Sequence, residues 1–156
     1  MTNLLAKLIG NKMWAVLNFL VVSISRSLFH PLISRSVLVL GVKGRKTGRK
    51  YYIPVSYYEY PEGRIVCVTD RPNLWWRNLV SVKEIEILFR GKLINVFVKI
   101  ESENNDLIKA HLASLCEHSR VDGFFAKVRY KQGKPLEEDL RSAASRMTAI
   151  ELNIPT

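Results

Sequence analysis

Residues 36–60 read SVLVLGVKGRKTGRKYYIPVSYYEY, a pattern that predicts two β-strands joined by a basic loop. The apolar run Ser36–Val42 is typical of a buried strand, and Lys50–Tyr60 is rich in the aromatic and β-branched residues that favour strands. Between them, Gly41–Lys50 holds three glycines and five cations. Pro54 cannot donate a hydrogen bond to a neighbouring strand, so we expect the second strand at a sheet edge or at a bulge.

The rest of the chain predicts more short strands, mostly joined as hairpins. The turn Pro61–Gly63 should connect the second strand to a third, Arg64–Thr69, as a hairpin. The other expected elements are the strands Glu84–Phe89, Leu93–Glu101 and Met147–Leu152 and the helices Leu74–Ser81, Asn104–His118 and Pro135–Ser145, with Val121–Tyr130 left open. Asp70 or Asn73 could cap the first of these helices. Because strands and helices do not alternate regularly, the pattern favours a mainly β (α+β) antiparallel barrel with appended helices.

The composition is that of one globular domain. The chain has 156 residues, of which 47% are apolar and 24% charged, and this excludes disordered, collagen-like and coiled-coil proteins. We expect an amphipathic helical segment over residues 1–33 and the barrel domain over residues 34–156. Cys67 and Cys116 lie far apart in the sequence, which favours a reducing, cytoplasmic setting.

The N-terminal segment has an apolar stripe at helical spacing, with Leu4, Leu8 and Leu20 among its members. Its longest uncharged stretch, Met13–Ser25, has 13 residues, whereas a membrane-spanning helix needs about 20. Two interpretations remain open. The helix packs on the domain or in a dimer interface, or residues 1–30 lie on the inner face of a membrane with Trp14 in the headgroup layer.

The positive charge is concentrated in the first third of the chain. The net charge is +10, and residues 1–58 carry nine cations and no Asp or Glu. The remaining residues hold 15 cations and 14 anions, so they are nearly neutral. This asymmetry predicts an anionic partner, such as a phosphate, a polyanion or a lipid headgroup, at the first third.

Side chains for metal or nucleophilic chemistry are not grouped in a convincing pattern. His111, Cys116 and His118 are close in sequence, but a complete ligand set with standard spacing is missing, so we interpret the histidines as surface residues and expect no metal. The sequence has no G-x-S-x-G elbow, and neither cysteine has a context that would activate it. We assign no catalytic residue.

The segment Gly44–Arg49 has the residues of an anion site. Its glycines allow backbone N–H groups to turn toward a ligand, Thr47 offers a hydroxyl, and Arg45 and Lys46 offer charge. The segment Leu74–Leu79 adds two indoles beside an Arg and an Asn. A phosphate grip next to flat apolar walls suits a phosphorylated planar ring, and also stacked bases.

A family resemblance narrows this choice. The string LGVKGRKTGRKYYIPVSYY at residues 40–58, followed by RIVCVT, RPNLWWRNL and EIEILFRGKLINVFV, resembles the deazaflavin-dependent nitroreductase family. That family belongs to the flavin-binding split-barrel superfamily of pyridoxamine-phosphate-oxidase type. The resemblance covers residues 36–101. It implies a split β-barrel, usually dimeric, that binds the deazaflavin coenzyme F-420 or, in relatives, FMN.

The resemblance also implies a set of cofactor-binding residues. They are Arg45, Lys46 and Thr47 at the phosphate-bearing tail; Tyr51, Tyr52, Ile53, Pro54, Val55 and Ser56 beside the ring; Thr69, Asp70 and Arg71 after the hairpin; and Trp75, Trp76, Arg77 and Asn78 at the aromatic helix. The chain departs from the family pattern in two places. The segment Asp70–Asn73 has no glycine, and Tyr51 stands where members often carry a cation.

The resulting hypothesis is an oxidoreductase in which a reduced deazaflavin gives a hydride to a small-molecule electron acceptor, such as a quinone, an activated alkene or a nitroaromatic. The alternatives are an FMN-binding protein of the same fold, a basic nucleic-acid-binding barrel, and a membrane-binding module without activity. The nucleic-acid alternative is not favoured, because the aromatic residues show no spaced platform pattern.

Overall fold

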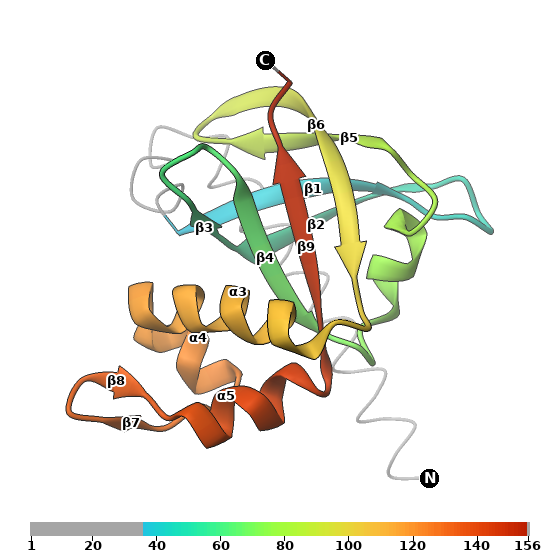
Figure 1. The fold of residues 1–156 in the computed structure, drawn as a ribbon. Helices are drawn as coiled ribbons and strands as arrows, with labels where there is room; N and C mark the ends of the chain where they lie inside the picture. Colours follow the sequence, from blue (N-terminus) through green and yellow to red (C-terminus); the bar gives the residue numbers. More distant parts are fainter. Residues whose placement is uncertain (1–35, 156) are drawn as a thin grey trace, which may run out of the picture.

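The structure, a computed structural model that describes residues 36–155, is built around a seven-stranded antiparallel sheet. Its strands follow the order β2-β1-β5-β6-β9-β4-β3 and curl into a barrel that carries helices on one side (Figure 1). The expected α+β antiparallel split barrel with C-terminal helices is confirmed. The helical segment expected over residues 1–33 lies outside the described residues. Among residues 36–155, every helix is too short or too polar to span a bilayer.

Most strands precede the α-helices in the chain, and the last strand of the sheet follows them. The strands are β1 (Val37–Lys43), β2 (Lys50–Ser56), β3 (Tyr58–Glu59), β4 (Ile65–Asp70), β5 (Glu84–Phe89), β6 (Lys92–Glu101) and β9 (Met147–Asn153), with a separate ribbon of β7 (Tyr130–Lys131) and β8 (Lys134–Pro135). The helices are the 3-10 helix η1 (Leu74–Leu79), α3 (Asn105–His118), α4 (Arg120–Phe125) and α5 (Glu137–Ala144).

The barrel closes where the chain bends at Tyr57. The single strand predicted over Lys50–Tyr60 is wrong, because the structure divides it into β2, which pairs with β1, and β3, which pairs with β4. Strands β2 and β3 are the first and the last in the sheet order, so one bent segment forms both edges of the sheet. The buried Tyr57 ring packs edge-on against Phe89 with centroids 5.4 Å apart, and this contact fixes the bend. The predicted hairpin is therefore limited to β3 and β4.

Strand β2 is an edge strand, as Pro54 predicts. Among the described residues β2 pairs with β1 alone, and Pro54 stands opposite Val39. A proline is tolerated there because no further strand needs its missing N–H.

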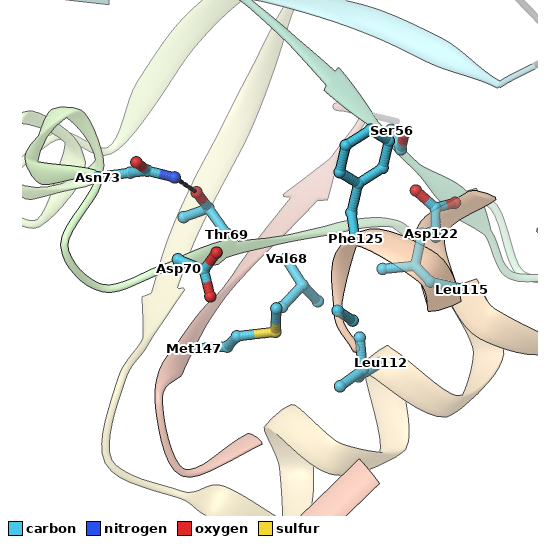
Figure 2. A pocket seen from close by; sticks show the side chains of 11 residues that line it. Ser56, Val68, Thr69, Asp70, Asn73, Leu112, Leu115, Asp122, Phe125 and Met147 are labelled. Carbon is cyan, nitrogen blue, oxygen red and sulfur yellow. Dashed lines mark hydrogen bonds between the residues drawn. The ribbon is translucent and has the colours of Figure 1, made fainter. Parts of the chain in front are cut away.

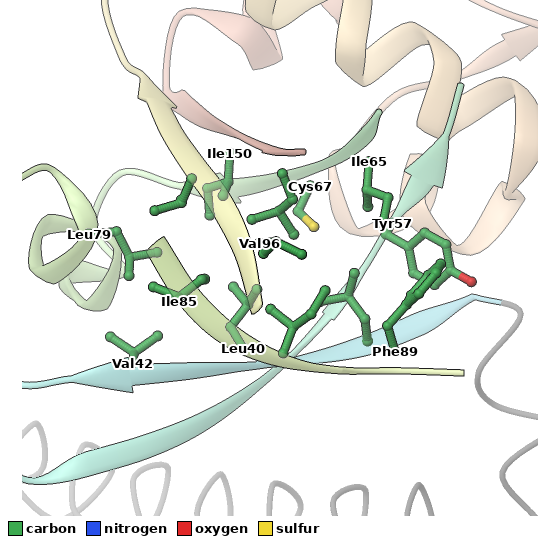
Figure 3. Close-up of a cluster of buried hydrophobic side chains, with 14 of the residues drawn as sticks. Leu40, Val42, Tyr57, Ile65, Cys67, Leu79, Ile85, Phe89, Val96 and Ile150 are labelled. Carbon is green, nitrogen blue, oxygen red and sulfur yellow. The ribbon is translucent and has the colours of Figure 1, made fainter. Parts of the chain in front are cut away.

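Inward-facing aliphatic side chains from five strands fill the barrel (Figure 3). Leu40, Ile65, Ile87, Val96 and Ile150 come from β1, β4, β5, β6 and β9 respectively, and each is fully buried. Burying one such side chain contributes about 1.5–3 kcal/mol. The predicted last strand is confirmed as β9, but it lies between β6 and β4 in the sheet.

Three helices form a second layer with its own apolar cluster. Helix α3 begins after Asn104, whose side chain accepts a hydrogen bond from the Leu107 N–H over 3.1 Å, so the predicted start is confirmed. Ile108, Leu112 and Leu140 lie at the centre of this cluster. The segment Val121–Tyr130, which the sequence did not assign, contains all of α4 except its first residue, together with the first residue of β7.

The short helix after β4 differs from its prediction. It is a 3-10 helix that ends at Leu79, two residues earlier than expected. Asn73 precedes it but does not cap it, because the Asn73 side-chain amide donates to the Thr69 hydroxyl over 3.3 Å instead. Asp70 remains in β4, where Arg146 pairs with its carboxylate.

Candidate functional site

The basic loop and the aromatic helix meet at a cavity of about 470 Å³, here called the basic cavity. The loop between β1 and β2 forms one side, and η1 forms the other. The lining residues are Gly44, Arg45, Lys46, Thr47, Tyr51, Ile53, Leu74, Trp75, Arg77 and Asn78. Two segments that the sequence singled out separately are thus neighbours in space.

A tight turn presents the charged side chains of the loop. The Gly44 N–H donates to the Arg49 carbonyl over 2.8 Å, and the Gly48 N–H donates to the Gly44 carbonyl over 2.9 Å. Gly48 has φ +67°, a conformation that favours glycine. At Gly44 a Cβ would lie 2.8 Å from the Thr47 hydroxyl oxygen, so a side chain there would force Thr47 to move.

Asn78 fastens η1 to this turn. Its side-chain oxygen accepts a hydrogen bond from the Arg45 N–H over 3.0 Å, and its amide nitrogen donates to the Trp75 carbonyl, also over 3.0 Å. One asparagine therefore fixes the backbone of the loop and the course of the helix that carries Trp75. This bond between residues 33 positions apart sets the distance between charge and indole.

The basic cavity has the chemistry of an anion site with flat walls. Arg45, Lys46 and Arg77 line it, and none of its lining residues is acidic. Lys50, by contrast, is neutralised by Glu86 outside this lining, and that hydrogen bond raises the pKa of Lys50. Cations without an acidic partner fit phosphate and carboxylate groups, and the Trp75 indole fits a planar ring. The donor set therefore fits the anionic tail and the ring of a flavin-type cofactor.

A second cavity, of about 360 Å³ and here called the acidic cavity, lies between the sheet and the helices (Figure 2). Strands β2, β4 and β9 contribute to one side, and α3 and α4 contribute to the other. The lining residues are Ser56, Val68, Thr69, Asp70, Asn73, Leu112, Leu115, Asp122, Phe125, Ala126 and Met147. It contains two carboxyl groups and no lysine or arginine.

The structure distributes the expected cofactor residues over the two cavities. The basic cavity takes Arg45, Lys46, Thr47, Tyr51, Ile53, Trp75, Arg77 and Asn78, and the acidic cavity takes Ser56, Thr69 and Asp70. The linings of both leave out Tyr52, Pro54, Val55, Arg71 and Trp76. Part of this division follows from the strand, since alternate residues point to opposite faces and Tyr51 and Ile53 share the face toward the basic cavity.

Arg71 and Trp76 hold the scaffold together. The Arg71 guanidinium donates to the Met147 carbonyl over 2.9 Å and to the Ser102 carbonyl over 2.7 Å. The Trp76 ring is 8% exposed and belongs to the barrel core, and its N–H donates to the Arg71 carbonyl over 3.0 Å. Both side chains connect η1 and the end of β4 to the sheet.

His111 corrects an expectation from the sequence. It is 2% exposed rather than a surface residue; its Nε2 lies 2.8 Å from Glu151 Oε1 and its Nδ1 lies 3.0 Å from the Tyr60 hydroxyl. The signal was its position in α3, since His111 shares the inward face with Ile108 and Leu115 at helical spacing. No metal-binding group of His, Cys, Asp or Glu occurs within residues 36–155.

Two further findings concern titratable groups. Sequence reasoning missed Asp122, whose pKa is raised mainly by burial, while hydrogen bonds from Ser56 and Ser119 act in the opposite direction. Burial also raises the pKa of Cys67 and raises that of Cys116 to about 11. Both cysteines are thus neutral thiols at pH 7, as expected of residues without a nucleophilic role.

Comparison with known proteins yields similarity at the level of fold. No family model matches the sequence, and no curated protein matches it. An F420-H2 dependent reductase superposes with a TM-score of 0.51 at 12% identity, covering 76% of this chain and 95% of that one. A pyridoxamine 5'-phosphate oxidase-related, FMN-binding protein from Nostoc punctiforme gives 0.51 at 11% identity, covering 87% and 78%.

A third similar structure is named for heme storage and not for a flavin. The heme storage protein HutZ from Vibrio cholerae superposes with a TM-score of 0.52 at 12% identity, covering 81% of this chain and 89% of that one. The fold alone therefore does not choose the ligand. This chain has the split-barrel fold that these solved structures share.

Proposed function

We propose that the protein is an oxidoreductase that holds the deazaflavin coenzyme F-420 in the basic cavity and reduces a small electrophilic acceptor. A quinone, an activated alkene or a nitroaromatic has the required chemistry. The observation that carries the proposal is the pairing of Arg45 and Lys46, which have no acidic partner in the cavity lining, with the Trp75 wall. The likeness in fold to an F420-H2 dependent reductase supports it.

The chain's own residues would bind and orient. Arg45 and Lys46 would neutralise phosphate and carboxylate groups of the tail, and the Thr47 hydroxyl would donate to them. Tyr51 and Ile53 on β2 would lie beside the ring, and Trp75 would cover it. Arg77 would add charge at the rim. Asn78 is a positioning residue, because it fixes the loop through the Arg45 N–H.

The remaining residues implied by the resemblance take a supporting part in this proposal. Tyr52, Pro54, Val55 and Ser56 complete the strand beside the ring, and Thr69, Asp70, Arg71 and Trp76 fix the end of β4 and the start of η1. When bound, the cofactor supplies the hydride. The protein contributes alignment of donor and acceptor, which alone can lower a barrier greatly. We assign no catalytic side chain.

A binding titration tests the proposal. The protein is titrated with F-420 and, separately, with FMN, and binding is followed by fluorescence. We expect F-420 to bind more tightly, and Arg45→Ala/Lys46→Ala to weaken it by about tenfold to a hundredfold, since each tenfold corresponds to about 1.4 kcal/mol. FMN is the alternative, supported by the FMN-binding protein of the same fold.

A matched control separates the effect of losing the binding site from the effect of lowering the net charge. The variant Lys131→Ala/Lys134→Ala removes two cations from the β7–β8 ribbon, outside the linings of both cavities. It should bind F-420 as the unaltered protein does. Equal weakening in both variants, or binding that Arg45→Ala/Lys46→Ala leaves unchanged, contradicts the placement. Hydride transfer is then measured with a quinone and a nitroaromatic.

The proposal extends to partners outside the described residues. Residues 1–30 would lie peripherally on the inner face of the membrane in the cytoplasm, which would favour a lipophilic quinone as acceptor. Co-sedimentation of the full chain with anionic vesicles tests this contact. We also propose a homodimer, which light scattering after gel filtration would detect.

A further inference from the structure

The acidic cavity is an apolar trough with a polar group at each end. Val68, Leu112 and Met147 lie along its middle, as Figure 2 shows. The Thr69, Asp70 and Asn73 group lies at one end, and Ser56 and Asp122 lie at the other. A molecule that fits this trough has an apolar body and a polar head.

The two carboxyl groups of the cavity are not equivalent. Arg146 Nη1 contacts Asp70 Oδ1, so the Asp70 charge is already neutralised. No lysine or arginine within residues 36–155 forms an ion pair with Asp122, and His118 is near enough for a charge on its ring to lower the Asp122 pKa. Among the described residues, Asp122 is therefore the carboxyl group of this cavity without a lysine or arginine in contact with it.

Asp122 faces the cavity from a firmly held position. It lies in the first turn of α4, where its N–H donates to the Ser119 hydroxyl over 3.3 Å. Burial raises the pKa of Asp122 and hydrogen bonds from Ser56 and Ser119 oppose that shift, so the ionised form is partly compensated where it stands. A bound cation would complete that compensation.

Phe125 provides an aromatic face at the rim. It lines the cavity while remaining 71% exposed, and its ring packs edge-on against Phe124 with centroids 5.6 Å apart. An aromatic ring next to a carboxylate is a recurring arrangement for organic ammonium groups, since both attract positive charge. The ring can close over a ligand head held by Asp122.

We propose that the acidic cavity is a separate binding site for a small apolar molecule that carries a positive charge, such as an arylalkylammonium ion. The ammonium group contacts Asp122 and the Phe125 ring, and the apolar body lies over Val68, Leu112 and Met147. The cavity volume of about 360 Å³ suits a body of one or two rings. The basic cavity selects the opposite charge, so the two sites do not compete.

Binding of three probes of similar shape tests the charge preference. The full chain, without added cofactor, is titrated with 2-phenylethylammonium, 2-phenylethanol and 3-phenylpropionate, and amide chemical shifts are followed by NMR. We expect the ammonium probe to bind at least about tenfold more tightly than the alcohol, a difference of about 1.4 kcal/mol. Equal affinity for the alcohol, or no shift around the cavity with any probe, overturns the proposal.

Variants locate the site. Asp122→Asn should abolish the preference for the ammonium probe over the alcohol. Phe125→Ala should lower the affinity for the ammonium probe severalfold. Glu117→Gln, which removes an exposed charge from α3, is the matched control. It should change neither the charge preference nor the affinity for the ammonium probe. If Asp122→Asn does not fold, Phe125→Ala decides, because truncating a side chain that is 71% exposed should change stability little. An unchanged affinity in Phe125→Ala would then refute the site.

A competition experiment separates this inference from the proposed function. Arg45→Ala/Lys46→Ala should bind 2-phenylethylammonium as the unaltered chain does, even if F-420 does not bind at all. Saturating F-420 or FMN should leave the ammonium probe in place. Displacement of the probe by either cofactor would assign the acidic cavity to the cofactor ring and overturn the inference.

Discussion

The two cavities lie along the same strand but depend on different parts of the structure. Ile53 and Ser56 of β2 line the basic and the acidic cavity respectively. The basic cavity is made by an exposed turn and a short helix, which one asparagine fastens together. The acidic cavity is made where the sheet and two helices pack. Its existence therefore depends on the core, whereas the basic cavity depends on local hydrogen bonds.

The largest expected difference between the cavities is in stability. Leu112→Ala removes a buried side chain from the wall of the acidic cavity and should lower the free energy of unfolding by about 2–5 kcal/mol. Tyr51→Ala removes a lining side chain of the basic cavity that is 44% exposed, and should cost less than about 1 kcal/mol. Urea denaturation measures both. Similar costs for the two variants would mean that the basic cavity also depends on tight packing.

The packing of α3, which forms part of the acidic cavity, can be tested at His111. This residue joins α3 to the sheet through Glu151 and Tyr60. His111→Leu leaves the buried Glu151 carboxylate without its nearest donor, since Arg64 Nη1 is 3.8 Å away. We expect a loss of about 1–3 kcal/mol in the free energy of unfolding.

A double variant tests the reason for that loss. His111→Leu/Glu151→Leu also removes the carboxylate, which in the single variant keeps only the distant Arg64 contact, and should recover part of the stability, because replacing both partners by apolar residues avoids a poorly satisfied buried group. If the double variant is less stable than the single one, the contact between α3 and β9 requires the polar pair itself.

The same contrast explains how much the sequence reveals. Pro54 indicates an edge strand, Asn104 indicates a helix start, and Gly44 and Gly48 indicate a basic turn, because each depends on residues close together in the chain. The bend at Tyr57 could not be predicted, since it is fixed by Phe89 in a distant strand. Asp122 could not be recognised either, because its cavity is assembled from β2, β4, α3, α4 and β9.

A smaller effect is expected where Asn78 fastens η1 to the basic loop. Asn78→Ala removes the acceptor for the Arg45 N–H and the donor to the Trp75 carbonyl, and should cost about 1 kcal/mol. The Arg45 amide should also exchange with deuterium faster. Asn95→Ala on the exposed side of β6 is the control and should leave that exchange rate unchanged. An unaffected Arg45 amide in Asn78→Ala would mean that the turn holds its shape without the helix.

The smallest expected effect concerns the pH dependence that Asp122 gives to stability. Burial raises the pKa of Asp122 in the folded state, so its contribution to folding is present below the unfolded pKa and is lost as pH rises through the folded value. The amide of Asp122→Asn cannot ionise, and the variant should gain stability relative to the unaltered protein between pH 3 and pH 7. Because the group is partly exposed, the gain should not exceed about 1 kcal/mol. Thermal unfolding across this pH range measures it, with Glu117→Gln as the control for lost surface charge. A difference that shrinks as pH rises would mean that the Ser56 and Ser119 hydroxyls outweigh burial, so that ionised Asp122 is already satisfied and needs no cation.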